Sequence, residues 1–189
     1  MTSHDDHVDR DDHRAHCADC GRPLTAPDGT LLEPWPGVDY PCPDAYLALS
    51  GHEREHHARG TEELCMIWVR PLPDFYLRGI LRIPVRGEDL GLESALWVQV
   101  SEESFLDYTE HYEDPEHSEV YPGQLATQVD GYSRSTSLPV QILTRGMELP
   151  LVVPDSTVSH PLVRDVYDGI DRSEAELRLR ALLLPASEG

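Results

Sequence analysis

Lysine is missing from this sequence of 189 residues, and all 15 of its basic residues are arginine. The absence of lysine excludes Schiff-base catalysis and the phosphate-binding loops that depend on a lysine side chain. Basic residues are outnumbered by 35 aspartate and glutamate residues, which gives a formal net charge of −20. Such a charge repels nucleic acid and anionic lipid, so we expect neither as a partner. Simple solubility is the preferred reason for the charge, and a basic protein or a metal ion is the kind of partner that it favours.

Long apolar runs are also absent. No segment approaches the roughly 20 apolar residues that a membrane helix needs. The N-terminus lacks the basic start and apolar stretch of a secretion signal. We therefore expect a cytoplasmic protein, in which the four cysteines are reduced thiols or metal ligands rather than disulfides. Cys65 stands in an apolar stretch and is expected to be a buried, inert thiol.

The composition divides the chain into three parts. Residues 1–16 are almost wholly aspartate, histidine and arginine, and we interpret them as a disordered, acidic and histidine-rich N-terminal arm. Residues 17–43 are rich in proline and glycine and predict a loop. Residues 44–189 carry the apolar patterns of regular structure and are expected to form one domain.

The spacing of apolar residues predicts both helices and strands in that domain. The expected strands span residues 64–69, 75–83, 95–100, 124–129, 137–144 and 149–153. Three helices are expected, the first over residues 44–59. The second is capped by Ser101 and has Phe105, Tyr108 and Tyr112 on one face. The third is C-terminal, begins with the capping box of Ser173 and Glu176, and has Leu179, Leu182 and Leu183 facing inward. Hairpin-like strands in a row favour an α+β fold, with an antiparallel sheet and helices packed on one side.

Cys17 and Cys20, followed by Gly21, are the strongest chemical signal in the sequence. Two thiolates separated by two residues can bind one zinc ion, and the glycine permits the tight turn between them. A closed structural site needs four ligands, so Cys42 and His16, or another histidine, would have to complete the set. The pattern indicates either a structural zinc knuckle or a reduced cysteine pair in a loop. Thiol redox chemistry is disfavoured, because the pair does not stand between a strand and a helix.

His52, Glu53 and His56 match the His-Glu-x-x-His pattern of zinc hydrolases. On a helix the two histidines share one face and the glutamate can activate water. The intervening Arg54 and Glu55 are charged, which indicates a solvated helix rather than the floor of a cleft. An exposed charged helix is therefore the preferred interpretation, and a zinc-dependent hydrolase or other metalloenzyme is the alternative.

Short motifs follow one another in a recognisable order between residues 62 and 172. They are Glu63-Leu64-Cys65, Arg78-Gly79-Ile80-Leu81-Arg82-Ile83-Pro84-Val85, Leu96-Trp97-Val98-Gln99-Val100-Ser101-Glu102-Glu103-Ser104-Phe105, Gly131-Tyr132, His160-Pro161-Leu162 and Gly169-Ile170. In this order they resemble the bacterial family known as domain of unknown function 2199. Members typically begin with a Cys-x-x-Cys-Gly pair, which Cys17-Ala18-Asp19-Cys20-Gly21 resembles. The resemblance implies a bacterial protein but no activity, because the family is uncharacterised.

Arg78, Arg82, Trp97, Tyr132 and His160 are the polar or amphipathic residues within these motifs and are the candidate binding residues. Arg78 and Arg82 share one face of an expected strand, where they can bind an anion or a partner's carboxylate. Pairing with the chain's own carboxylates is the alternative. A histidine before proline, as at His160, is also typical of a turn or a helix cap.

No coherent catalytic constellation accompanies the negative charge. We therefore expect a non-enzymatic cytosolic protein that binds another protein. One version is an immunity- or antitoxin-like protein that masks a basic partner by electrostatic complementarity. The rival hypothesis is a metal-dependent enzyme that uses His52, Glu53 and His56, or the cysteine pair.

Overall fold

The computed structural model describes residues 21–69 and 71–183. In this part of the chain the elements follow one another as β1 (Val38–Asp39), α1 (Asp44–Leu47), α2 (Gly51–His57), β2 (Ala58–Gly60), β3 (Leu64–Ile67), β4 (Asp74–Pro84), β5 (Gly91–Val100), α3 (Glu102–Glu110), β6 (Val120–Leu125), β7 (Pro139–Arg145), β8 (Glu148–Pro154), α4 (Pro161–Asp168) and α5 (Arg172–Leu183). The eight strands form one hydrogen-bonded sheet. Of the helices in this described part, none is long and apolar enough to cross a membrane.

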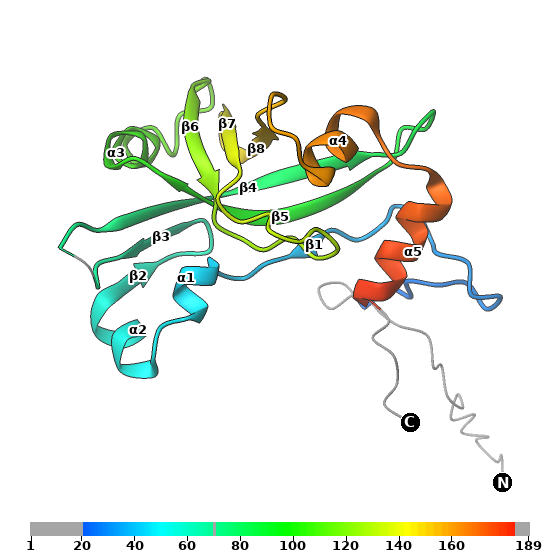
Figure 1. The fold of residues 1–189 in the computed structure, drawn as a ribbon, viewed down its shortest axis with the longest axis horizontal. Coiled ribbons are helices and arrows are strands. Elements are labelled where there is room, and N and C mark those ends of the chain that lie inside the picture. Colours follow the sequence, from blue (N-terminus) through cyan, green and yellow to red (C-terminus); the bar gives the residue numbers. More distant parts are fainter. Residues whose placement is uncertain (1–20, 70, 184–189) are drawn as a thin grey trace, which may run out of the picture.

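The sheet closes on itself through the long strands β4 and β5, which pair antiparallel along their length. From β5 it continues antiparallel through β6, β7 and β8. β8 then returns to β4 in a parallel pairing that places Leu151 opposite Ile80. Strands β4 to β8 thus form a closed five-stranded barrel, while β3 and β2 extend the sheet beyond β4, and β1 pairs with β5 (Figure 1).

The mixed α+β character is confirmed, but the prediction of a plain antiparallel sheet with helices on one side was wrong. Alternating apolar residues report which face of a strand is buried, but they do not report which strands become neighbours. Closure brings β8 close to β4 at Gly79, where a Cβ atom would lie 2.9 Å from the Pro150 carbonyl oxygen. The helices are spread around the barrel, with α3 near one end and α4 and α5 near the other (Figure 1).

The barrel interior is filled by buried side chains of all five strands, and one face of β4 and β5 contributes the most. The set expected to face one way on β4 is confirmed as buried, and it comprises Phe75, Leu77, Gly79, Leu81 and Ile83. The outer face of the same two strands is covered in part by a second apolar cluster of Ala58, Cys65, Ile67, Tyr76 and Trp97. Removal of these side chains from water is the main force that holds the strands together.

The helix expected over residues 44–59 is divided into α1 and α2. Ser50 starts the second helix, because its hydroxyl accepts a hydrogen bond from the Glu53 amide while the Glu53 carboxylate accepts from the Ser50 amide. This reciprocal capping satisfies two backbone donors and favours a new helix start at this position. Ser101 caps α3 as predicted, with its hydroxyl accepting from the Ser104 amide.

The C-terminal helix α5 begins earlier than predicted. The Asp171 carbonyl accepts from the Ala175 amide, so Ser173 lies inside the helix instead of capping it. Leu179 is buried as predicted, but Leu182 is exposed because the last turn projects past the barrel (Figure 1). The side chain of Leu183 lies outside the described part. The strand expected over 124–129 is shifted to β6, because the chain turns at residues 129–132.

Candidate functional site

The predicted zinc knuckle is described only through Cys42. The arm of residues 1–16 and the candidate ligands His16, Cys17 and Cys20 lie outside the described residues. Cys42 lines a pocket of about 270 Å³ together with Cys65. Burial raises the pKa of both thiols, that of Cys65 to about 11, so both are protonated at neutral pH. Zinc binding by the full set stays a prediction.

The His-Glu-x-x-His motif lies on α2, which buries none of its residues. The His52 and His56 rings lie 4.2 Å apart between centroids. The Glu53 carboxylate, however, accepts hydrogen bonds at 2.8 and 2.7 Å from the amide and hydroxyl of Ser50. The glutamate therefore acts as a helix cap, and in the described residues no third protein ligand joins the two histidines.

Arg78 and Arg82 are paired with the chain's own carboxylates. Arg78 binds the Asp39 carboxylate and donates to the Glu62 carbonyl at 3.0 Å. Arg82 lies 3.8 Å from carboxylate oxygens of Asp89 and Glu93. This agrees with the alternative that both arginines pair with the chain's own carboxylates, and a role in ligand binding stays a prediction.

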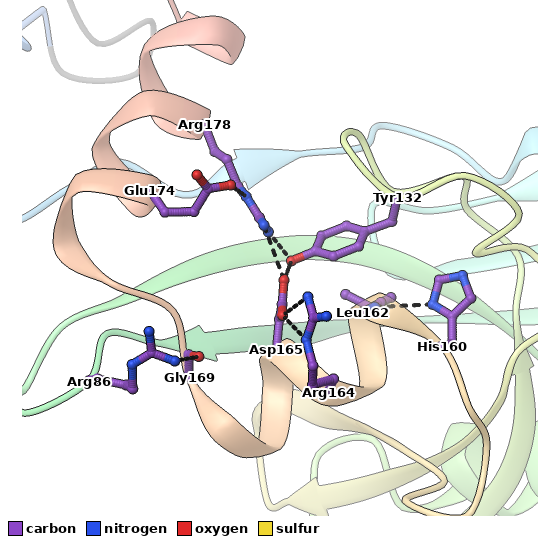
Figure 2. Close-up of polar contacts among 9 residues, drawn as sticks. All are labelled: Arg86, Tyr132, His160, Leu162, Arg164, Asp165, Gly169, Glu174 and Arg178. Atoms are coloured by element: carbon purple, nitrogen blue, oxygen red, sulfur yellow. Dashed lines mark hydrogen bonds and ion pairs between the residues drawn. The ribbon is translucent and has the colours of Figure 1, made fainter.

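Trp97 is buried on the outer face of β5, where its Nε1 donates to the Tyr40 carbonyl at 2.8 Å. It lies opposite Arg78 on β4. The structure therefore brings three of the predicted binding residues, Arg78, Arg82 and Trp97, to one pair of strands. Tyr132 and His160 lie elsewhere, beside α4 (Figure 2).

Tyr132 belongs to a buried network around Asp165 of α4 (Figure 2). The Asp165 side chain is 4% exposed and accepts from the Tyr132 hydroxyl at 2.8 Å. Arg178 of α5 donates to the same carboxylate at 3.1 Å, and Arg164 donates to its other oxygen at 2.8 Å. Burial alone would raise the pKa of Asp165, but the hydrogen bonds from Arg164, Tyr132 and Arg178 outweigh it and the net shift is downward.

His160 is the cap of α4, as the sequence alternative indicated. Its Nδ1 accepts from the Leu162 amide at 3.1 Å, and its Nε2 lies 3.0 Å from the Ser133 carbonyl oxygen. Pro161 occupies the first position of the helix, where a missing amide hydrogen costs nothing. Both ring nitrogens have backbone partners, so in this arrangement neither one is free to meet a ligand (Figure 2).

A different kind of surface lies on α3 and the loop that leads to β6. Residues 102–119, which we call the acidic segment, contain no arginine and eight carboxylates. These are Glu102, Glu103, Asp107, Glu110, Glu113, Asp114, Glu116 and Glu119. All but Asp107 are exposed. In the described part of the chain none of them forms an ion pair with an arginine.

Elsewhere seven of the described arginines pair with carboxylates. Ion pairs with carboxylates are formed by Arg78, Arg82, Arg86, Arg145, Arg164, Arg172 and Arg178. Outside the acidic segment, ten of the 20 described carboxylates pair with an arginine, whereas none of the eight within it does. Exposed apolar side chains accompany it, namely Leu106 and Tyr112, with Val120 at the start of β6.

Asp107, His111 and His117 meet within the acidic segment, each with one ligand atom, and these atoms all lie within 4.8 Å of one another. His111 Nδ1 lies 3.5 Å from Asp107 Oδ1, and His117 Nε2 lies 4.0 Å from Asp107 Oδ2. The two imidazole rings are stacked with centroids 4.8 Å apart. The hydrogen bond to the Asp107 carbonyl and the nearby Asp107 carboxylate raise the pKa of His111.

This triad was missed in the sequence, although a signal for it exists. Asp107 and His111 are four residues apart, a spacing that places two side chains on one face of a helix. His117 follows in a loop, where no periodic pattern reports its position. A candidate His/Asp metal-binding triad is thus a finding of the structure.

Comparison with curated proteins and with solved structures yields no match. A family model described as "Uncharacterized protein conserved in bacteria (DUF2199)" matches residues 16–170. The matched stretch contains the cysteine pair, the whole barrel, the acidic segment and the carboxylate of Asp165, while α5 with Arg178 lies beyond it. The match covers most of the chain and confirms the resemblance of its motifs. The protein therefore belongs to the DUF2199 family of uncharacterized bacterial proteins.

Proposed function

We propose that this protein is a non-enzymatic binding module of the bacterial cytoplasm whose acidic segment docks a basic protein partner. The observation that supports this most is the charge distribution. Eight carboxylates follow one another in residues 102–119 without an arginine, whereas ten of the 20 other described carboxylates pair with one. An immunity-like protein that masks a basic partner is the specific version of this proposal.

Electrostatic complementarity explains how such a surface acts. Exposed carboxylates attract a basic surface over roughly 8–10 Å at physiological salt and speed up the encounter. They contribute specificity and association rate more than affinity. Affinity comes mainly from apolar side chains that lose water on contact. Leu106, Tyr112 and Val120 are exposed and are the candidate anchors.

The test compares two variants with the same loss of charge. In the first, Glu110→Gln, Glu113→Gln and Glu116→Gln neutralise exposed positions of the acidic segment. In the control, Glu55→Gln, Asp89→Asn and Asp168→Asn remove three exposed carboxylates elsewhere. Each tagged protein is incubated with native lysate at low and high salt, and captured proteins are quantified by mass spectrometry.

We expect a basic partner that the parent and the control capture at low salt, that high salt releases, and that the acidic-segment variant fails to capture. Equal capture by the two variants would contradict docking at residues 102–119. Capture that is insensitive to salt would contradict an electrostatic mechanism as a whole.

We also propose that the protein binds a structural zinc ion as a cofactor. Its ligands would be Cys17, Cys20, Cys42 and His16. Elemental analysis of protein purified without chelator should find one zinc ion per chain that a Cys17→Ser, Cys20→Ser variant loses. An equal zinc content in the two proteins would rule out the cysteine pair as ligands.

A further inference from the structure

We propose that Asp107, His111 and His117 bind a divalent transition-metal ion of the zinc class. This site is distinct from the cysteine knuckle and does not depend on the docking function. Two imidazoles and one carboxylate form a ligand set typical of such ions, because imidazole nitrogen suits Zn²⁺ and its neighbours in the first transition row. Mg²⁺ and Ca²⁺ prefer sites made of oxygen.

The distances between the ligand atoms are close to those that one ion requires. With metal–ligand bonds of about 2.0–2.1 Å in tetrahedral geometry, neighbouring ligand atoms lie roughly 3.3 Å apart. Asp107 Oδ1 and His111 Nδ1 lie 3.5 Å apart, and Asp107 Oδ2 and His117 Nε2 lie 4.0 Å apart. The two distances involve different oxygens of Asp107, and the three ligand atoms are spread over as much as 4.8 Å, so the side chains must rotate to meet on one ion.

The backbone holds the two histidines in place. Asp107 and His111 lie on successive turns at the end of α3. The His117 carbonyl accepts from the Gly146 amide at 2.8 Å, and the His117 amide donates to the Asp114 backbone carbonyl at 3.2 Å. Gly146 is required here, since a Cβ atom at this position would lie 2.3 Å from the Pro115 carbonyl oxygen. The turn between β7 and β8 thus fixes the loop that carries His117.

Tyr121 of β6 orients the carboxylate. Its hydroxyl donates to Asp107 Oδ2 at 2.5 Å and lies 2.8 Å from His117 Nε2. Outer-sphere hydrogen bonds of this kind fix the geometry of metal ligands. When the ion binds at Nε2 of His117, the hydrogen that this atom shares with the Tyr121 oxygen moves to Nδ1. The hydrogen bond from Tyr121 to Asp107 remains. At His111 the ligand atom is Nδ1, which lies 2.9 Å from the Asp107 carbonyl oxygen, so ion binding breaks that contact and leaves the ring hydrogen on Nε2.

The surroundings favour a cation. His117 is buried, with 8% of its side chain exposed, whereas Asp107 and His111 are about 40% exposed and leave an approach from solvent. The carboxylates of the acidic segment raise the local concentration of cations. That segment contains no arginine to compete for Asp107.

The experiment titrates the full chain carrying Cys17→Ser and Cys20→Ser, so that the cysteine pair cannot contribute. Isothermal titration calorimetry with ZnCl₂ measures affinity and stoichiometry, with MgCl₂ and CaCl₂ as comparison ions. Co²⁺ absorption spectra then report the ligand type. The variants are His111→Gln, His117→Gln and Tyr121→Phe, and His52→Gln on α2 is the matched control.

We expect one Zn²⁺ per chain and a visible Co²⁺ spectrum without thiolate charge transfer. His111→Gln and His117→Gln should weaken Zn²⁺ binding by about 100-fold or more, and Tyr121→Phe by about 10- to 100-fold. His52→Gln should leave the binding unchanged. His111 is exposed enough for its variant to keep the fold, which circular dichroism checks.

Two results would overturn the site. The first is Zn²⁺ affinity that survives in both His111→Gln and His117→Gln. The second is Mg²⁺ or Ca²⁺ binding as tight as Zn²⁺ binding, which would indicate general attraction to an acidic surface. Neither outcome bears on the capture of a basic partner, so failure of this site and failure of the proposed function are distinguishable.

Discussion

Two acidic regions of this molecule contain the same residue types in opposite settings. Around Asp165, one buried carboxylate accepts from Tyr132, Arg164 and Arg178. On the acidic segment, eight carboxylates have no arginine within the segment, and seven of them are exposed. A buried charge is tolerated only when it is paired, so the first region serves the fold. An exposed, unpaired charge adds little to stability and is free to act on another molecule.

Asp165→Ala should have the largest effect on stability. It leaves the Tyr132 hydroxyl and the Arg178 guanidinium without their shared partner. Breaking such a buried pair costs 3–5 kcal/mol, and the partial exposure of both arginines places the expected loss at about 3 kcal/mol. Urea unfolding measures the change. Asp168→Ala, an exposed position on the same helix, should stay within about 0.5 kcal/mol, and equal losses in the two variants would refute the contrast.

The pH dependence of the free energy of unfolding tests the role of the Asp165 charge directly. The pKa of Asp165 is lowered from its ordinary value of 3.8 in the folded protein. Its stabilising contribution is therefore complete above about pH 5 and is lost as the pH falls through the folded value. The difference in unfolding free energy between the parent and Asp165→Ala should shrink as the pH falls below about 5. A difference that stays constant over this range would show that the charge is not what the variant removes.

His160→Ala should have an intermediate effect. Loss of a side-chain cap costs about 1 kcal/mol, because the Leu162 amide then lacks its acceptor. His160→Asn keeps a side-chain acceptor and should recover most of the loss. Urea unfolding and amide exchange at the first turn of α4 measure both variants. If the asparagine variant were as unstable as the alanine variant, the contact of His160 with Ser133 would be the more important one.

The acidic segment should give the smallest effect on folding. Glu110→Gln, Glu113→Gln and Glu116→Gln together should change the free energy of unfolding by no more than about 0.5 kcal/mol, as is usual for surface positions. The same variant should lose its salt-sensitive partner. A large loss of stability would show that these carboxylates support the fold, as Asp165 does. Thermal unfolding followed by circular dichroism decides between a small and a large loss.

Local features of the fold were predicted well. Alternation along residues 75–83 identified the buried face of β4, and Ser101 was recognised as the cap of α3. Both depend on residues a few positions apart. The break at Ser50 was missed because its capping box lies inside a stretch that reads as one helix. Closure of the barrel was missed because the pairing of β8 with β4 joins residues about 70 positions apart, here Leu151 and Ile80.

For the candidate sites, too, the sequence indicated local features but not contacts between distant residues. The motifs pointed to Tyr132 and His160, and the structure places both in contacts around α4. They gave no sign that Asp165 and Arg178 share a hydrogen-bond network. The spacing of Asp107 and His111 was visible, but His117 joins them only through a loop held by the turn between β7 and β8.

The sequence by itself determined the net charge, the lack of lysine, the buried faces of the strands and the membership of a bacterial family. These are properties of composition and of short-range order. Only the tertiary structure decided which carboxylates are neutralised and which remain open to a partner or an ion. The reason is physical: charges interact through space, and the distances between them are set by how distant strands and helices pack.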